Sequence, residues 1–245
     1  MSLNGYWILT SNHRLLHFDE VVSEITIRLQ SQPVAIAMTR DSQGCLVLDR
    51  SGYIEAHGTA RSLGDLSSLD LVAEPVDIAA SPTGVGYWVL DSEGSVFSFG
   101  NAPFLEGLPQ AIGHGVTAVK IEPTADGDGY WIVDQKGGVH SFGSAPFYGA
   151  LVDDRPVDGL RVVDFAAGPD NRGYLFLDSD GRVYPLGDVS YFGSPALLGR
   201  VDAVGLISRP GGYLVVDARG AVTAFGDVAN LGSPVGLGVN VLGVA

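Results

Sequence analysis

The chain has 245 residues, of which 46% are hydrophobic and 17% are charged, so it holds enough apolar material for a sizeable core and is not a disordered chain. Its 28 acidic and 14 basic residues give a formal net charge of −14, which argues against a nucleic acid partner because phosphate backbones would be repelled. No apolar run approaches the ~18 residues that a membrane span requires.

One motif recurs along the whole chain. Its six copies are GYWILTSNHRLLHFD from Gly5, GCLVLDRSGYIEAHG from Gly44, GYWVLDSEGSVFSFG from Gly86, GYWIVDQKGGVHSFG from Gly129, GYLFLDSDGRVYPLG from Gly173 and GYLVVDARGAVTAFG from Gly212. Successive copies start 39, 42, 43, 44 and 39 residues apart. A period of ~40–45 residues is the length of one four-stranded propeller blade. We therefore predict an all-β, six-bladed β-propeller of four-stranded antiparallel blades.

Each repeat divides into four predicted strands. The first is rich in small residues, as in PVAIAM, PVDIAA and VVDFAA. The second is the Tyr-Trp strand, which is apolar on both faces, as expected for a strand packed between two neighbouring blades. The third resembles SVFSFG, and the fourth, as in APFLEGL and APFYGAL, is the weakest.

The two ends of the chain are predicted to share one blade. The chain opens on a second strand, and the C-terminal GVNVLGVA carries the missing first-strand pattern. We expect a single, monomeric domain over 1–245, with blade 1 formed by 5–31 plus 238–245. The other blades are expected at about 32–72, 73–114, 115–158, 159–199 and 200–237.

The recurring Asp-x-x-Gly is interpreted as a turn between the second and third strands. Asp accepts hydrogen bonds from amides a few residues on, and Gly adopts positive φ at low cost. In the first copy, Thr10 and His13 hold these places. The tryptophans and Cys45 lie on second strands, so we expect them to be buried in packing, whereas Phe104, Phe147, Tyr148, Tyr191 and Phe192 on fourth strands are expected to be exposed.

A polar position near the start of the first strand suggests a ligand site. Aligning the Val-Asp pairs places Ala35, Asp77, Thr117, Asp164, Asp202 and Asn240 together around the mouth of the central channel. The last five are predicted ligand-binding residues. Asp77, Asp164, Asp202 and Asn240 would offer the several oxygens that Ca²⁺ prefers, and His114, just before a first strand, is the candidate general base. The competing interpretation is a hydrated channel end that holds no cofactor.

The segment GYWIVDQKGGVHSFGSAPFYGA resembles a propeller repeat of bacterial proteins that are often secreted or attached to the cell wall, and SNHRLLHFD is similar to the NHL propeller repeat. The resemblance implies a non-catalytic binding or scaffolding module of a larger bacterial protein. Its expected partner is a protein or a cell-surface polysaccharide. The alternative is a calcium-dependent hydrolase or lyase with its site at the channel mouth. The compartment stays open: extracellular or cell-wall-associated for a piece of a secreted protein, and cytoplasmic otherwise.

Overall fold

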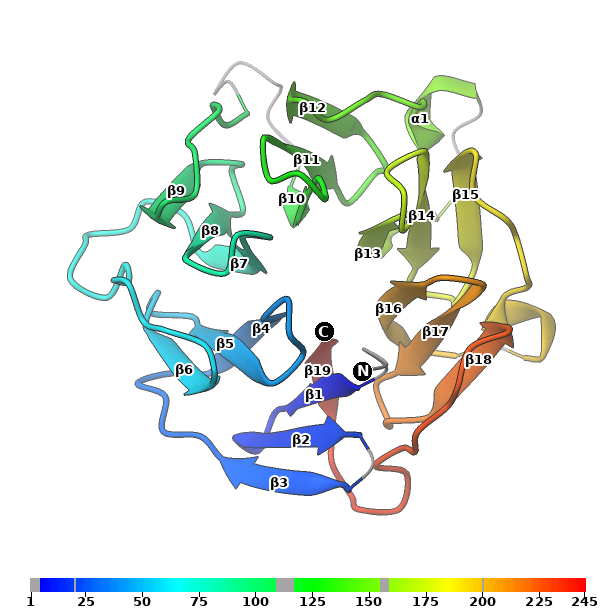
Figure 1. Ribbon diagram of the computed structural model, residues 1–245. Helices are drawn as coiled ribbons and strands as arrows, with labels where there is room; N and C mark the ends of the chain where they lie inside the picture. The colour runs from blue at the N-terminus through cyan, green and yellow to red at the C-terminus, as the bar shows by residue number, and fades with distance from the viewer. Residues whose placement is uncertain (1–4, 20, 109–116, 155–158, 200) are drawn as a thin grey trace.

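The computed structural model describes residues 5–19, 21–108, 117–154, 159–199 and 201–245. Within these residues the strands form six antiparallel sheets, arranged in a ring around a central axis (Figure 1). We call the sheets blades 1 to 6 in chain order. Among the described residues, no helix is long and apolar enough to cross a membrane.

The strands of each blade follow one another from the axis outward (Figure 1). Blade 1 contains β19 (Val241–Val244), β1 (Tyr6–Thr10), β2 (Arg14–Phe18) and β3 (Ser23–Thr26), and blade 2 contains β4 (Pro33–Met38), β5 (Gly44–Asp49) and β6 (Ile54–Gly58). Blade 3 contains β7 (Pro75–Ala80), β8 (Gly86–Asp91) and β9 (Val96–Gly100), and blade 4 contains β10 (Ala118–Pro123), β11 (Gly129–Asp134) and β12 (Val139–Gly143). Blade 5 contains β13 (Val162–Ala167), β14 (Gly173–Asp178) and β15 (Val183–Gly187), and blade 6 contains β16 (Ala203–Arg209), β17 (Gly212–Asp217) and β18 (Val222–Gly226). The short helices α1 (Leu151–Asp154) and η1 (Pro195–Leu197) lie in the connections that follow blades 4 and 5.

The predicted closure by the C-terminal segment is confirmed. β19 pairs with β1 in antiparallel register, with Ile8 opposite Val244 and Leu9 opposite Gly243. The first strand of blade 1 therefore comes from the far end of the chain, and main-chain hydrogen bonds fasten the two ends together.

The core consists of apolar layers between neighbouring blades. Tyr130 of β11 packs against Trp88 of β8, with ring centroids 5.7 Å apart, and both side chains are fully buried. Trp131 is likewise fully buried, and its Nε1 donates to the carbonyl of Pro146 at 2.8 Å. The expectation that the tryptophans pack between blades is confirmed, as is the burial of Cys45, which raises the pKa of its thiol to about 12.

The prediction of four-stranded blades is wrong for most of the ring. Within the described residues, blades 2 to 6 contain three strands each, and blade 1 contains four. The segments that follow the third strands in blades 2 to 6 (residues 59–66, 101–108, 144–151, 188–195 and 227–234), here called the outer segments, form no sheet ladder. Pro103 and Pro146 lack the N–H that a ladder needs, and Gly193 and Gly232 have positive φ.

Tyrosine hydroxyls hold the outer segments in place of a ladder. The Tyr87 hydroxyl, on blade 3, accepts a hydrogen bond from the Leu63 amide at 2.9 Å and donates to the Gly64 carbonyl, both in blade 2. The same pair of bonds is made by Tyr130, Tyr174 and Tyr213 to the blade that precedes each of them. We call this arrangement the tyrosine clasp. Cys45 replaces the tyrosine where the preceding blade has the strand β3 instead of an outer segment.

Candidate functional site

The Asp-x-x-Gly turns use their carboxylates to hold the main chain. In blade 3, one oxygen of Asp91 accepts hydrogen bonds from the amides of Glu93 at 3.0 Å and Ser95 at 2.8 Å. Gly94 has φ 86°, and a Cβ there would lie 2.5 Å from the side chain of Leu108. The interpretation of Asp-x-x-Gly as a turn is confirmed.

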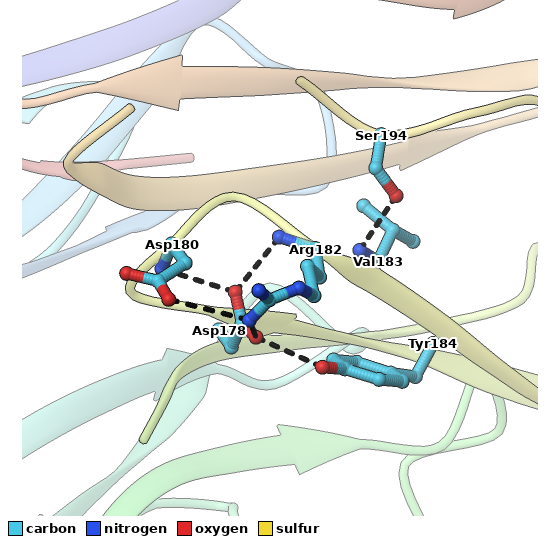
Figure 2. Close-up of polar contacts among 6 residues, drawn as sticks. All are labelled: Asp178, Asp180, Arg182, Val183, Tyr184 and Ser194. Carbon is cyan, nitrogen blue, oxygen red and sulfur yellow. Dashed lines mark hydrogen bonds and ion pairs between the residues drawn. The ribbon is translucent and has the colours of Figure 1, made fainter. Parts of the chain in front are cut away.

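In blade 5, side chains as well as amides bond to the turn carboxylate (Figure 2). Asp178 Oδ1 accepts the amides of Asp180 at 3.0 Å and Arg182 at 2.7 Å, while Oδ2 accepts the Tyr184 hydroxyl at 2.9 Å. The Arg182 guanidinium adds an ion pair to Asp178 at 3.4 Å. Burial, with the contact to Asp178, raises the pKa of Tyr184 to about 12. Every oxygen of this carboxylate is engaged in shaping the turn.

The channel residues form two rings. One main-chain hydrogen bond recurs in every blade. The amide of the residue that follows the turn Asp donates to the carbonyl of the residue that precedes the first strand, as Ser92 does to Glu74 at 2.9 Å. In blade 1, Thr10 takes the place of the turn Asp. The acceptors of these six bonds are Gln32, Glu74, Thr117, Arg161, Asp202 and Asn240, which we call the outer ring. Thr117, Asp202 and Asn240 therefore lie level with Glu74, three residues before the position of Asp77.

A second ring lies deeper along the first strands. Asp77 pairs with Leu90, Lys120 with Val133 and Asp164 with Leu177, so these three residues are equivalent. The complete inner ring is Ala35, Asp77, Lys120, Asp164, Gly205 and Gly243. The assumption that all six predicted mouth residues share one level is wrong. Ala35, Asp77 and Asp164 belong to the inner ring, and Thr117, Asp202 and Asn240 belong to the outer ring.

A collar of apolar side chains separates the two rings. Each first strand carries a bulge at its start, where one residue has no partner across the ladder. The six bulged residues are Val34, Val76, Val119, Val163, Val204 and Leu242, and all of them line the same narrow part of the channel together with Asp77, Lys120 and Asp164. The channel thus narrows to an apolar constriction directly above a layer of buried charge.

Lys120 occupies the centre of that charged layer. Its Nζ lies 3.2 Å from Asp164 and 3.7 Å from Asp77, so one ammonium bridges blades on both sides of its own. Burial alone would lower the pKa of Lys120, but Asp164 and Asp77 outweigh it and hold this pKa above its ordinary value. Lys120 was not singled out in the sequence, because Thr117 was aligned in its place.

Carboxylates in the channel also join blade 3 to blade 4, blade 4 to blade 5 and blade 5 to blade 6. Asp77 accepts the Ile121 amide at 2.9 Å, and Asp164 accepts the Leu206 amide at 2.7 Å. Glu122 accepts the Ala167 amide at 3.3 Å in the same way. These amides face the channel on the unpaired edge of a first strand, where a buried N–H without an acceptor would be costly.

Burial makes two of these carboxyl groups reluctant to ionise. Burial raises the pKa of Asp77 to about 6, although Lys120 works in the opposite direction. It raises the pKa of Glu122 to about 7, again against the effect of Lys120. The Lys120 ammonium thus lies among carboxyl groups, two of which, Asp77 and Glu122, have pKa values raised toward neutrality.

The predicted calcium site can be compared with this geometry. Asp77 and Asp164 each share their oxygens between a main-chain amide and Lys120, while Asp202 and Asn240 lie one level further out. In the described part of the chain there is no group of three or more His, Cys, Asp or Glu side chains that could hold a metal ion. The roles of these four residues in calcium binding, and of Asp77, Thr117, Asp164, Asp202 and Asn240 in ligand binding, stay predictions. His114 lies outside the described residues.

No family model matches the chain, and no curated protein matches it in sequence. Among solved structures, it is similar to a chain in the crystal structure of a nidogen/laminin complex, with a TM-score of 0.69 at 10% identity over 98% of this chain and 97% of that one. It is also similar to the β-propeller domain of Cps50 (Swd1) from Myceliophteria thermophila, with a TM-score of 0.56 at 10% identity over 90% of this chain and 80% of that one. The fold is a β-propeller. At this identity the likeness shows the fold alone, and the resemblance to a bacterial repeat family stays a prediction.

One face of the propeller carries exposed aliphatic side chains. The connections between blades begin beside the Asp-x-x-Gly turns, as the bonds from Leu66 to Gly52 and from Leu151 to Gly137 show, and they end at the outer ring. They therefore lie on the same face as the turns, here called the turn face. The exposed aliphatic residues of these connections are Leu69, Val72, Val152, Leu197, Leu198, Val235 and Leu237, which we call the aliphatic rim.

Sequence reasoning missed the aliphatic rim and partly found the exposed aromatic residues. Phe104, Phe147, Tyr191 and Phe192 are exposed as expected. Tyr148 is only half-buried and packs against Tyr174, and its hydroxyl donates to the Asn171 carbonyl. The signal for the rim was available: the pairs Leu197-Leu198 and Val235/Leu237 lie in connections that are otherwise rich in Gly and Pro.

Proposed function

We propose that this propeller is a non-catalytic binding module that docks a protein partner on its turn face. The aliphatic rim is the observation that carries the proposal. Val72 is 93% exposed, and Leu197 and Leu198 are 74% and 79% exposed. Exposed aliphatic side chains that gather on one face are typical of an interaction surface, whereas isolated ones are not.

The opposite face supports the same choice of surface. One connection on this face, between β2 and β3, carries the exposed Val21 and Val22. Five other loops join the first strands to the second strands, at residues 39–43, 81–85, 124–128, 168–172 and 210–211. In these loops Val85 is the sole large hydrophobic residue that is exposed. The loops are instead tied down by short polar networks, such as the one in which the Thr39 and Thr59 hydroxyls both bond to Asp41.

A protein partner is also consistent with the comparison structures. A chain of the same fold occurs in a nidogen/laminin complex, where proteins associate with one another. For the present chain, a rim of aliphatic residues surrounding the polar outer ring would form an apolar surface with polar groups at its centre. We therefore favour a protein surface over a polysaccharide, which would call for exposed aromatic rings on this face.

The alternative of a calcium-dependent hydrolase gains no comparable support. The two predicted donors that lie together, Asp77 and Asp164, are bridged by Lys120 and bonded to main-chain amides. Each carboxylate thus pairs with an ammonium group and accepts a hydrogen bond from a main-chain amide, and these structural roles are enough to explain why both are present. We therefore propose that these residues maintain the ring.

The experiment compares two quadruple variants in affinity capture from the source cells, followed by titration of the purified captured protein. The rim variant is Leu197→Ser, Leu198→Ser, Val235→Ser and Leu237→Ser. The control replaces four exposed apolar residues away from the turn face, by Val21→Ser, Val85→Ser, Phe104→Ser and Phe147→Ser. We expect wild type and control to bind the same protein with equal affinity and the rim variant to lose at least about tenfold. The proposal would be contradicted if the rim variant bound as tightly as wild type, or if the control alone lost affinity.

A further inference from the structure

The channel widens again beyond Lys120, on the side away from the outer ring. There the ends of the first strands enclose a chamber of about 250 Å³ that is lined by residues from every blade. The hollow exists because several of these strands have alanine in their last two positions: Ala37, Ala79, Ala80, Ala166 and Ala167 all line it. At ~30 Å³ per water molecule in the liquid, the chamber has room for a small organic molecule.

Glu122 faces this chamber from β10. Its Oε1 accepts the Ala167 amide at 3.3 Å. Its Oε2 makes no hydrogen bond to any residue that the structure describes, and so it remains available to a guest. Glu122 lies in the same electrostatic cluster as Asp77, Lys120 and Asp164. Lys120 also lines this end of the chamber, and its ammonium is paired with Asp77 and Asp164 in the narrow part of the channel, so Glu122 is the carboxylate among the lining side chains.

Arg209 faces the chamber from the end of β16. Its Nη1 donates to the Ser208 carbonyl and its Nη2 to the Gly5 carbonyl, both at 3.1 Å. Both acceptors are neutral, and within the described residues no carboxylate forms an ion pair with this guanidinium. Burial lowers the pKa of Arg209. An uncompensated guanidinium favours a carboxylate guest, which it can bind through two N–H groups.

The chamber thus carries the Glu122 carboxylate, next to Lys120, at its inner end and the Arg209 guanidinium near its opening. Glu122 lies opposite Trp131, while Arg209 lies opposite Gly212, so Arg209 stands about two residues further out along the strand direction. At ~3.3 Å per residue, the two charges are offset by roughly 7 Å along the axis. The walls between them are apolar and include Ile78, Phe165 and Leu206.

We propose that this chamber binds a small zwitterionic amino acid, with its ammonium group on Glu122 and its carboxylate on Arg209. The carbon chain of the guest would lie against the apolar walls. This site lies on the other side of the charged layer from the turn face. It is therefore independent of the proposed protein docking, and either one can hold without the other.

Calorimetry on the full chain tests the proposal with four probes. Glycine and 4-aminobutanoate are a short and a long zwitterion, while butylamine and butanoate each lack one charge. We expect at least one zwitterion to bind at least about tenfold more tightly than both singly charged probes. Equal binding of butylamine or butanoate, or no binding of either zwitterion at millimolar concentrations, would overturn the proposal.

Variants then locate the site. Glu122→Gln and Arg209→Met should each weaken zwitterion binding by at least about tenfold. Ala167→Leu should abolish zwitterion binding by filling the chamber. This variant keeps the Arg209 contact to Gly5, so it tests the site even if Arg209→Met impairs folding. The control is Arg172→Met, which removes an exposed arginine paired with Asp188 and should change nothing. Binding that survives both Ala167→Leu and Glu122→Gln would place the guest elsewhere and overturn the proposal.

Discussion

At the scale of single residues, one position in the outer segments requires positive φ. Glycine meets the requirement in four blades, at Gly64, Gly149, Gly193 and Gly232, whereas blade 3 has Glu106 with φ 93°. The carbonyl of this residue is the acceptor of the tyrosine clasp, so the conformation cannot relax without breaking that bond. A side chain at this φ costs on the order of 1 kcal/mol or more.

Glu106→Gly should therefore raise the melting temperature, with a gain of about 1 kcal/mol in the free energy of unfolding. The matched reverse change is Gly149→Glu, for which the nearest atom to the new Cβ is Leu186 Cδ1 at 3.7 Å, so conformational strain and not a clash would be measured. It should destabilise by a similar amount. Thermal unfolding of both variants tests for this strain. A melting temperature of Glu106→Gly below that of wild type would contradict it.

The hydroxyl of the clasp can be tested on its own. Tyr130→Phe removes the acceptor of the Leu105 amide and the donor to the Glu106 carbonyl. We expect a loss of about 1–3 kcal/mol, because two main-chain groups lose their partner. Tyr53→Phe is the control, since the Tyr53 hydroxyl makes no hydrogen bond within the described residues. Urea unfolding of the two variants should separate them, and an equal small effect of both would show that the clasp contributes little.

Glu122 gives a pH dependence with a definite sign. Its pKa is about 7 in the folded protein and 4.5 ordinarily, so between these values the folded state holds a proton that the unfolded state has released. Stability from this group therefore falls as pH rises through that window. Glu122→Gln should match wild type near pH 4 and exceed it at pH 8 by on the order of 1–3 kcal/mol. If the stability difference between Glu122→Gln and wild type were the same at both pH values, the raised pKa of Glu122 would be contradicted.

At the scale of the elements, the Asp-x-x-Gly turn allows the backbone requirement at its Gly and the hydrogen bonds of its Asp to be tested separately. Gly94→Val forces a β-branched residue to positive φ and brings its Cβ against Leu108, so it should cost at least about 2–3 kcal/mol. Asp91→Asn keeps an oxygen for the amides of Glu93 and Ser95 and should cost clearly less. Chemical denaturation of both variants tests this order, and the reverse order would show that the charge of Asp91 matters more than the turn.

The sequence was sufficient to predict three of the four elements in each repeat. Second and third strands are apolar and bounded by Asp-x-x-Gly, and both signals arise from local chemistry. The outer segments were taken for strands because they are apolar. Their proline residues and positive-φ positions prevent a ladder, and the hydroxyl that holds them belongs to the neighbouring blade. Such a contact between blades leaves no local signature in the segment itself.

The channel was predicted less well because two similar patterns lie three residues apart. Val-Asp pairs mark the inner ring at Val76-Asp77 and the outer ring at Val201-Asp202, so alignment by pattern mixed the rings. Counting back from the glycine that opens the second strand would have avoided this. Asp77, Lys120 and Asp164 each lie nine residues before Gly86, Gly129 and Gly173. That count would have placed Lys120 between the two carboxylates.

At the scale of the whole molecule, a few recurring devices stabilise the joints between blades. Apolar layers lie between blades, tyrosine clasps fasten the outer segments, channel carboxylates hold the inner edges, and β19 joins the two ends. Three of the 28 acidic residues, Asp77, Glu122 and Asp164, are used in this way. The net charge of −14 belongs to the chain as a whole, and the exposed aliphatic rim is a more specific guide to the partner.

The central claim is that channel carboxylates maintain the ring while the aliphatic rim binds the partner. It is tested by measuring the melting temperature and the affinity for the captured protein in two variants. Asp77→Asn with Asp164→Asn removes both ion-pair partners of the buried Lys120, so the protein should melt at a lower temperature yet bind with unchanged affinity below that temperature. The rim variant should melt like wild type and lose affinity. A channel variant that keeps its melting temperature and loses the partner would contradict the account and place the binding site in the channel.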